Sequence, residues 1–162
     1  MSNTQAMCTS FLGELMTATH NFGTAPTRGA STADTFKAAL YLTTATVNAA
    51  TTAYSATNEV TGTNYAAGGV TVTNATAPTA TNSTATAGTA YWTPSASLTY
   101  GSAGTPVTLT TAFDTVLIYN STQSNKAVSV HTFGSQTITA GIFTLTMPTN
   151  STTTALLRLA TV

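Results

Sequence analysis

The chain has 162 residues, a length typical of one domain. Only 5% of the residues are charged, and four acidic side chains balance four basic ones, so the net charge is zero. Binding to phosphates requires several clustered cations. This composition therefore argues against nucleic acid as a partner, whereas a near-neutral surface favours self-association into an oligomer.

Threonine is the second compositional feature, because the chain contains 42 threonine and 13 serine residues. Disorder typically combines low hydrophobicity with high net charge, but here 42% of the residues are hydrophobic and the net charge is zero. Threonine is β-branched and fits a pleated sheet. The composition therefore predicts β structure whose exposed face carries hydroxyl groups rather than charges.

The N-terminal segment predicts one amphipathic helix, over residues 3–19. Its apolar residues recur at i, i+3 and i+4 spacing and are Met7, Cys8, Phe11, Leu12, Leu15 and Met16. The helix lies against its own sheet or docks on a partner subunit. The segment lacks the basic start and apolar run of a signal peptide, and no stretch reaches the ~18 apolar residues of a membrane span. We therefore expect no membrane partner and a protein that is made and kept inside a cell or released by lysis.

The pattern changes from a helical to a strand-like period at Asp34. Residues 36–42 alternate as a half-buried strand does, and a second strand is predicted at 70–72, directly after a Gly68-Gly69 turn or bulge. Residues 74–90 are polar and contain no large apolar side chain, so they are predicted to form a long loop.

The second half of the chain predicts many short strands, separated by glycine, asparagine and proline. They cover residues 90–93, 106–111, 113–119, 127–133, 136–139, 142–147 and 155–160. Strands at such spacing are typical of a sandwich or barrel. We predict an all-β fold, an antiparallel β-sandwich that is jelly-roll-like or Ig-like, with a short N-terminal helix. Residues 1–33 would form the helix and an arm, and residues 34–162 a single β-sandwich domain.

The residues that usually carry chemistry are few and scattered. His20 and His131 are the only histidines, and each is expected to be a surface or edge residue. Cys8 is the only cysteine, so it forms no internal disulfide and is expected to pack as a small hydrophobe. A zinc site needs clustered His and Cys, and calcium needs several acids at close spacing. The sequence therefore predicts no enzyme, no catalytic residue, no metal site and no cofactor.

Two further patterns support hypotheses about single side chains. Aromatic residues could stack on sugars in a glycan-binding module, and the candidates are Tyr54, Tyr65, Tyr91, Trp92 and Tyr100. Glu59 stands among neutral residues and is expected to accept backbone N–H bonds from the turn at 62–65.

Two stretches carry a resemblance to a known group. They are "DTFKAALYLTTATVNAATTAYSATNEVTGTNYAAGG" (34–69) and "LIYNSTQSNKAVSVHTFGSQTITAGIFTLTMP" (117–148), and the helical "FLGELMTATHNF" (11–22) precedes them. Together they resemble small β-rich virion structural proteins of tailed bacteriophages, including capsid decoration or cement proteins. The resemblance covers most of the chain and rests on strands and turns rather than on a catalytic motif.

The resemblance implies a non-enzymatic phage structural protein that is assembled in the bacterial host cytoplasm and resides in the virion. Its expected role is a decoration or cement protein that binds between capsomers and stabilises the head. The major capsid protein, other virion proteins and further copies of the chain would be its partners, and loops 43–58 and 74–90 would reach them. The alternatives are a neck, collar, tail or fibre component of the virion, and a receptor or glycan-binding module.

Overall fold

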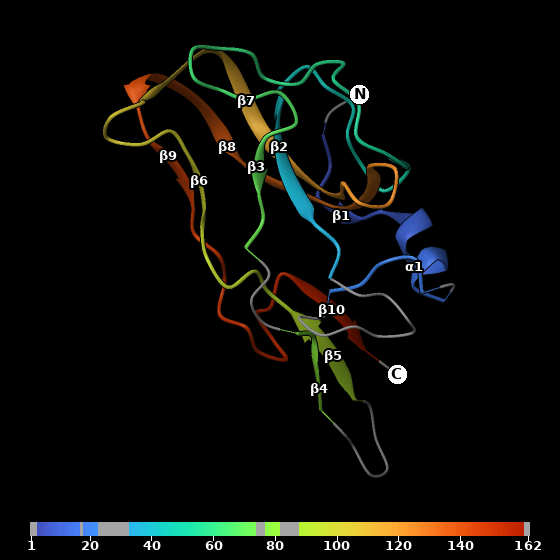
Figure 1. Ribbon diagram of the computed structural model, residues 1–162. Helices are drawn as coiled ribbons and strands as arrows, with labels where there is room; N and C mark the ends of the chain where they lie inside the picture. The colour runs from blue at the N-terminus through green and yellow to red at the C-terminus, as the bar shows by residue number, and fades with distance from the viewer. Residues whose placement is uncertain (1–2, 17, 23–32, 74–76, 82–87, 161–162) are drawn as a thin grey trace.

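The computed structural model describes residues 3–16, 18–22, 33–73, 77–81 and 88–160. Its elements in chain order are β1 (Ala6–Met7), α1 (Thr9–Met16), β2 (Phe36–Leu42), β3 (Val70–Thr71), β4 (Thr79–Ala80), β5 (Thr89–Trp92), β6 (Leu98–Tyr100), β7 (Val107–Asn120), β8 (Lys126–Gly141), β9 (Phe143–Leu145) and β10 (Leu157–Ala160) (Figure 1). The described residues thus form antiparallel sheets with one short N-terminal helix, which confirms the predicted all-β, sandwich-like fold class.

The largest sheet has five strands in the order β1-β8-β7-β2-β3. Its centre is the β7–β8 hairpin, whose strands have 14 and 16 residues. The turn between them contains Ser124 and Asn125 at φ of 54° and 59°, a left-handed conformation that asparagine tolerates better than most residues. β2 pairs with β7 from Phe36↔Asn120 to Leu42↔Phe113. Five of the seven β2 residues are buried and the other two are half-buried, so both faces of the strand are covered, which explains its nearly continuous apolar sequence.

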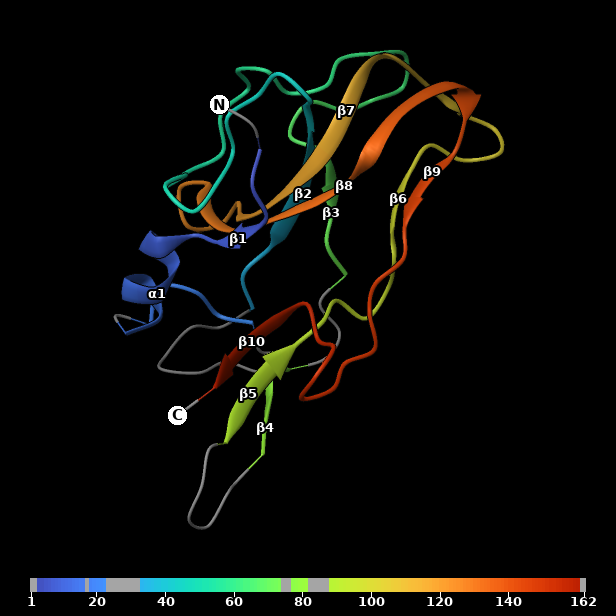
Figure 2. The same ribbon diagram turned by 180° about the vertical axis from the view of Figure 1, so that it is seen from behind.

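Two smaller sheets complete the fold, one with the strand order β10-β5-β4 and one formed by β6 and β9. Both views place the β4–β5 pair at one end of the molecule (Figures 1 and 2). The end of the β7–β8 hairpin that lies opposite its turn is at the other end of the molecule. Aromatic rings connect α1 to the five-stranded sheet and to the three-stranded sheet. The Phe22 ring centroid lies 4.4 Å from that of Phe36 on β2, 4.8 Å from that of Trp92 on β5 and 5.9 Å from that of Phe11 on α1. The helix therefore packs against its own chain and shares one core with the five-stranded and the three-stranded sheet.

The N-terminal segment differs from the expected helix over residues 3–19. Residues 6 and 7 form β1 instead, in register with Val130 and Ser129 of β8. The Cys8 N–H extends this ladder by donating to the Val128 carbonyl at 3.0 Å. Pairing with the edge of a sheet satisfies these backbone groups before the helix begins at Thr9.

The strands also depart from the predicted bounds. The expected pairs of short strands at 106–111 with 113–119, and at 127–133 with 136–139, are the single strands β7 and β8. The pairing of β7 with β8 contains register shifts, for example between Leu109 and Phe113, which mark bulges that interrupt the ladder without ending the strands. β6 was not predicted, since an alternation over only three residues is too short to indicate a strand. β4 and the start of β5 lie within the predicted loop 74–90, whose residues 74–76 and 82–87 are outside the described residues.

Candidate functional site

Three hollows follow one another between the β1–β8 side of the large sheet and the smaller sheets. Their volumes are about 100, 430 and 120 Å³. Met7 and Leu157 line both the first and the second hollow, and His131, Pro148 and Leu156 line both the second and the third. Since neighbouring hollows share walls, we treat them as one feature, the interlayer groove.

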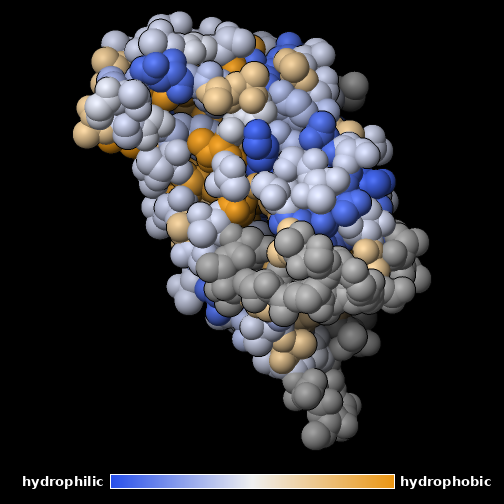
Figure 3. Space-filling view, viewed as in Figure 1, coloured by the Kyte–Doolittle hydropathy of each residue, from blue (hydrophilic) through white to orange (hydrophobic). Residues whose placement is uncertain are grey.

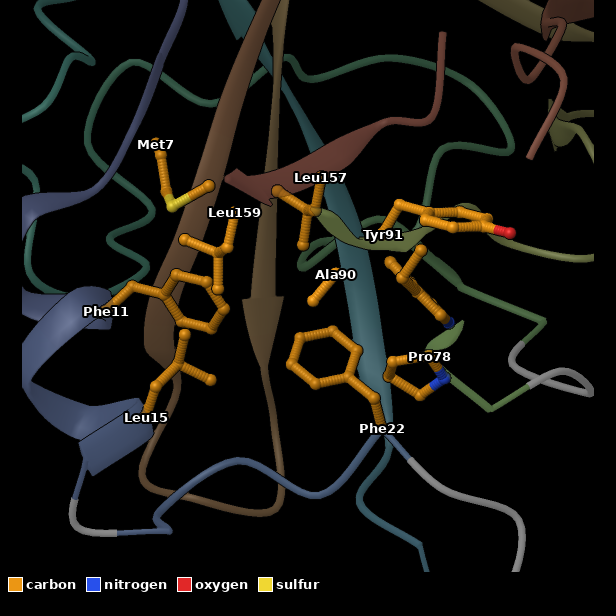
Figure 4. A pocket seen from close by; sticks show the side chains of 10 residues that line it. Met7, Phe11, Leu15, Phe22, Pro78, Ala90, Tyr91, Leu157 and Leu159 are labelled. Atoms are coloured by element: carbon orange, nitrogen blue, oxygen red, sulfur yellow. The ribbon is translucent and has the colours of Figure 1, made fainter. Parts of the chain in front are cut away.

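The first hollow is apolar. Figure 4 shows side chains from α1 and from β10 that point toward one another around it. Its lining residues are Met7, Phe11, Leu15, Phe22, Pro78, Ala90, Tyr91, Trp92, Leu157 and Leu159. Leu159 is 41% exposed, one of three large hydrophobic side chains described with such exposure. This end of the groove therefore offers an apolar surface that is open to solvent.

The second hollow is polar and lies in the middle of the groove. Its polar lining includes Gln5, Ser129, His131, Thr154 and Arg158. The Ser129 hydroxyl and the His131 Nε2 atom are 2.9 Å apart. Burial lowers the pKa of His131 to about 4, so its ring is neutral at neutral pH. Among the described residues that line the groove, Arg158 is then the one charged side chain.

The third hollow is again mainly apolar and lies between the β7–β8 hairpin and the β6–β9 ribbon. Its lining residues are Leu98, Val116, Ile118, His131, Thr132, Phe133, Leu145, Thr146, Met147, Pro148 and Leu156. The interlayer groove thus has an apolar, a polar and again an apolar section.

The Ser129–His131 pair resembles the nucleophile and base of a hydrolase, but its surroundings suit hydrogen bonding instead. A nucleophilic serine needs a base and an orienting acid, and all four acids of the chain are engaged elsewhere, as shown below. A histidine with a pKa of about 4 is a weak base at neutral pH, and Ser129 is only 1% exposed. The expectation of a surface or edge His131 overlooked this pair, although i and i+2 spacing on a strand puts both side chains on one face.

Two sheet edges border the polar section. β1 is the end strand of the five-stranded sheet and β10 the end strand of the three-stranded sheet. Residues of both strands line the second hollow, among them Ala6 and Met7 of β1 and Leu157 and Arg158 of β10. β1 has only two residues, and the 43–58 loop runs beside it, since the Thr4 and Thr9 N–H groups donate to the Val47 and Ala49 carbonyls at 3.1 and 2.9 Å. The edge of β10 is the one that presents N–H and C=O groups for pairing with another strand. The polar section is therefore suited to an extended polypeptide.

Glu14 and His20 form a second polar cluster, at the β7–β8 turn. Glu14 Oε2 lies 2.7 Å from His20 Nε2, and Glu14 Oε1 accepts a hydrogen bond from Lys126 Nζ at 2.6 Å. Burial opposes ionisation of Glu14, but the hydrogen bonds from Lys126 and His20 outweigh it and lower the pKa of the carboxyl. The expectation that His20 is a surface residue was wrong, since its side chain is 0% exposed.

Asp34 continues this cluster and shows that it is structural. The Asn120 side-chain amide donates to Asp34 Oδ2 at 2.7 Å and lies 3.0 Å from His20 Nδ1. Asp34 also accepts the Asn21 N–H at 2.9 Å and the Gln123 side-chain amide at 3.1 Å. Both ring nitrogens of His20 are thus occupied, which leaves no free nitrogen to act on a substrate.

Glu59 is 5% exposed and accepts three hydrogen bonds. The donors are the Tyr54 hydroxyl at 2.5 Å, the Tyr65 hydroxyl at 2.8 Å and the Gly68 N–H at 2.7 Å. Glu59 is therefore the structural acceptor that was expected, but its backbone donor is Gly68 rather than an amide of the 62–65 turn. The fourth acid, Asp114, accepts hydrogen bonds from Asn3 at 2.8 Å and Thr115 at 2.7 Å.

The aromatic residues that suggested sugar stacking do not form a common platform. Tyr100 and Trp92 are 1% and 2% exposed. Tyr54 and Tyr65 direct their hydroxyls to Glu59, and only Tyr91 lines the groove without being buried. Four of the five side chains therefore serve the fold.

The loop at 43–58 lies against its own sheet. Ala45 and Val47 are 1% and 5% exposed. Its backbone bonds to β8 and to the adjoining turn, through Ala127 N–H to Thr52 O at 3.0 Å and Tyr54 N–H to Asn125 O at 2.9 Å. This loop is therefore held in place within the molecule rather than extended toward a neighbour.

Comparisons with known proteins identified no relative: no family model, no curated protein and no solved structure matches the chain. Across the described residues, no group of three or more His, Cys, Asp or Glu side chains is arranged to hold a metal ion. A helix with the length and apolar character needed to cross a membrane is likewise not found in that part of the chain.

Proposed function

We propose that the protein is a non-enzymatic virion structural protein of a tailed bacteriophage, and that it acts as a capsid decoration or cement protein. In this role it binds the major capsid protein between capsomers, as an oligomer of its own chain, and stabilises the head. The particle is assembled in the bacterial cytoplasm.

The observation that carries the proposal is the interlayer groove, which is bordered by the edge of β10. It suits an extended polypeptide, because a backbone edge flanks a polar section between two apolar ones. The acids, by contrast, are all used to hold the fold together, which leaves no carboxylate pair for hydrolysis. The resemblance of residues 34–69 and 117–148 to phage structural proteins supplies the virion context.

The surface supports the same role. In Figure 3 most atoms on the visible face have intermediate hydropathy, with a hydrophobic patch and strongly hydrophilic residues scattered around it. A protein with zero net charge gains little from long-range electrostatic repulsion between copies. Within a particle, fit to neighbouring subunits then matters more than solubility by charge.

Copy number in purified virions tests the proposal. The chain is quantified by mass spectrometry against the major capsid protein of the same particles. Near-stoichiometric amounts are expected for a decoration or cement protein. A few dozen copies or fewer would instead indicate a neck, collar, tail or fibre component, and absence from virions would overturn the proposal. A glycan array then tests the remaining alternative, a receptor or glycan-binding module.

A further inference from the structure

The charge of the interlayer groove is unbalanced. Arg158 lines its polar section and is exposed, and the hydrogen bond from its Nη1 reaches only the Thr152 carbonyl, at 3.4 Å. No acidic residue is among the described residues that line any of the three hollows. An occupant with a carboxylate at this point would complement the guanidinium.

A second copy of the chain is poorly suited to supply that carboxylate. Each of the four acidic side chains already accepts hydrogen bonds inside its own fold, with donors from Lys126 for Glu14, Asn120 for Asp34, Tyr65 for Glu59 and Asn3 for Asp114. Withdrawing any of them would leave buried or half-buried donors unpaired, which is costly. These bonds favour a different chain as the source of the charge complement.

We infer that the interlayer groove binds an extended segment of a different protein, with one acidic residue flanked on both sides by aliphatic residues. The acidic residue pairs with Arg158. The aliphatic residues enter the two apolar sections, one of which is lined by Leu159 of β10. The backbone of the segment pairs with the edge of β10, which borders the polar section. This inference rests on the proposed function in so far as it assigns the groove to a binding partner.

The test uses a fluorescent nine-residue peptide with a central aspartate, two valines and two leucines around it, and blocked ends. Two matched peptides carry asparagine or lysine at the centre. Fluorescence anisotropy with the full chain should show the aspartate peptide binding about fivefold more tightly than the asparagine peptide, the upper range for an exposed ion pair. The lysine peptide should bind more weakly still.

Charge reversal provides the decisive comparison. In Arg158→Glu the order should invert, so that the lysine peptide binds best. Arg158 is exposed, so the variant is expected to fold, and its circular dichroism spectrum checks this. Leu159→Thr should weaken the binding of all three peptides to a similar degree. Ile142 is 50% exposed and lies outside the groove, so Ile142→Thr should leave all three affinities unchanged.

Equal affinity for the three peptides, or an order that Arg158→Glu leaves unchanged, overturns the inference. Absence of saturable binding at millimolar peptide also overturns it. Self-association that Leu159→Thr abolishes, measured by sedimentation, would assign the groove to a second copy and likewise contradict it. The virion role is tested separately. If the chain distinguished the three peptides as expected but were absent from virions, the inference about the groove would stand and the proposed function would be rejected.

Discussion

Glu59 and Tyr65 connect a peripheral segment to β2 of the large sheet. The Tyr65 hydroxyl donates to Glu59 Oε1 at 2.8 Å and accepts the Leu40 N–H of β2 at 2.9 Å. Next to this chain of bonds, Tyr41 on β2 forms an isolated bridge with Glu59. A single carboxylate thus ties residues 54–68 to β2, in a protein that has only four acids.

Glu59→Gln should destabilise the protein strongly, although the two side chains have nearly the same shape. Three donors converge on the carboxylate, and glutamine would offer one acceptor and turn its own N–H groups toward donors. Lost hydrogen bonds to a charged group predict a decrease of about 2–4 kcal/mol in the free energy of unfolding, measured by urea denaturation at pH 7. Tyr91→Phe, outside this cluster, is the control. An unchanged midpoint for Glu59→Gln would reject the structural role.

The tyrosines predict an alkaline limit to stability. Burial raises the pKa of Tyr41 and of Tyr119 to about 12. Burial, together with Glu59, also raises the pKa of Tyr54, Tyr65 and Tyr100. Because the folded-state pKa lies above the unfolded value of about 10, the neutral hydroxyls stabilise the fold fully below pH 10, and this stability is lost as the pH rises toward 12. Absorbance of tyrosinate and circular dichroism should change together in that interval. Tyrosinate formation by these five tyrosines near pH 10 without unfolding would contradict the buried network.

Glu14 predicts a smaller effect at acid pH. Its folded-state pKa is lowered by Lys126 and His20, so the ionised carboxylate contributes stability that is present above its unfolded pKa and lost as the pH falls through the folded one. Lys126 is 38% exposed, so solvent limits the contribution of the pair to about 1 kcal/mol or less. Glu14→Gln should therefore lower the free energy of unfolding slightly at pH 7 and make it less dependent on pH below 5. A wild-type slope retained in the variant would assign the acid sensitivity to another group.

The Gly68-Gly69 turn allows a sharp backbone test. Gly69 has a φ of 72°, and a Cβ there would lie 1.7 Å from the Ala38 carbonyl oxygen. Gly134 on β8 has no atom within 4 Å of the same position, so it is the matched control. Gly69→Ala should lower the free energy of unfolding by about 3 kcal/mol or more, because β2 and β3 must separate to admit the methyl group. Gly134→Ala should change it by no more than about 0.5 kcal/mol. Similar thermal midpoints for the two variants would show that the turn does not hold β3 against β2.

Local pattern was sufficient to predict the class of the fold but not its long-range pairings. Alternation predicted β2, and the paired glycines predicted the turn before β3, because both signals lie within a few residues. Alternation did not show that 106–111 and 113–119 are one strand, since the bulge near Phe113 interrupts the period while pairing with β8 continues. The groove was not predictable, because its walls come from residues as distant as Met7 and Leu157. The burial of His20 likewise depends on Asn120, which is 100 residues away.

Cys8 provides a measurement of how firmly the N-terminal segment is held. It lies between β1 and α1, is 0% exposed, and burial followed by the charge of Glu14 raises the pKa of its thiol to about 11. Both the lack of access and the small thiolate fraction slow reaction with a thiol reagent at pH 8. We therefore expect labelling only as fast as the protein unfolds globally, because β1 belongs to the five-stranded sheet and Phe11 to the common core. Labelling much faster than global unfolding would instead show that residues 6–16 open as a separate unit. In that case the N-terminal segment would behave as an arm rather than as part of the sandwich.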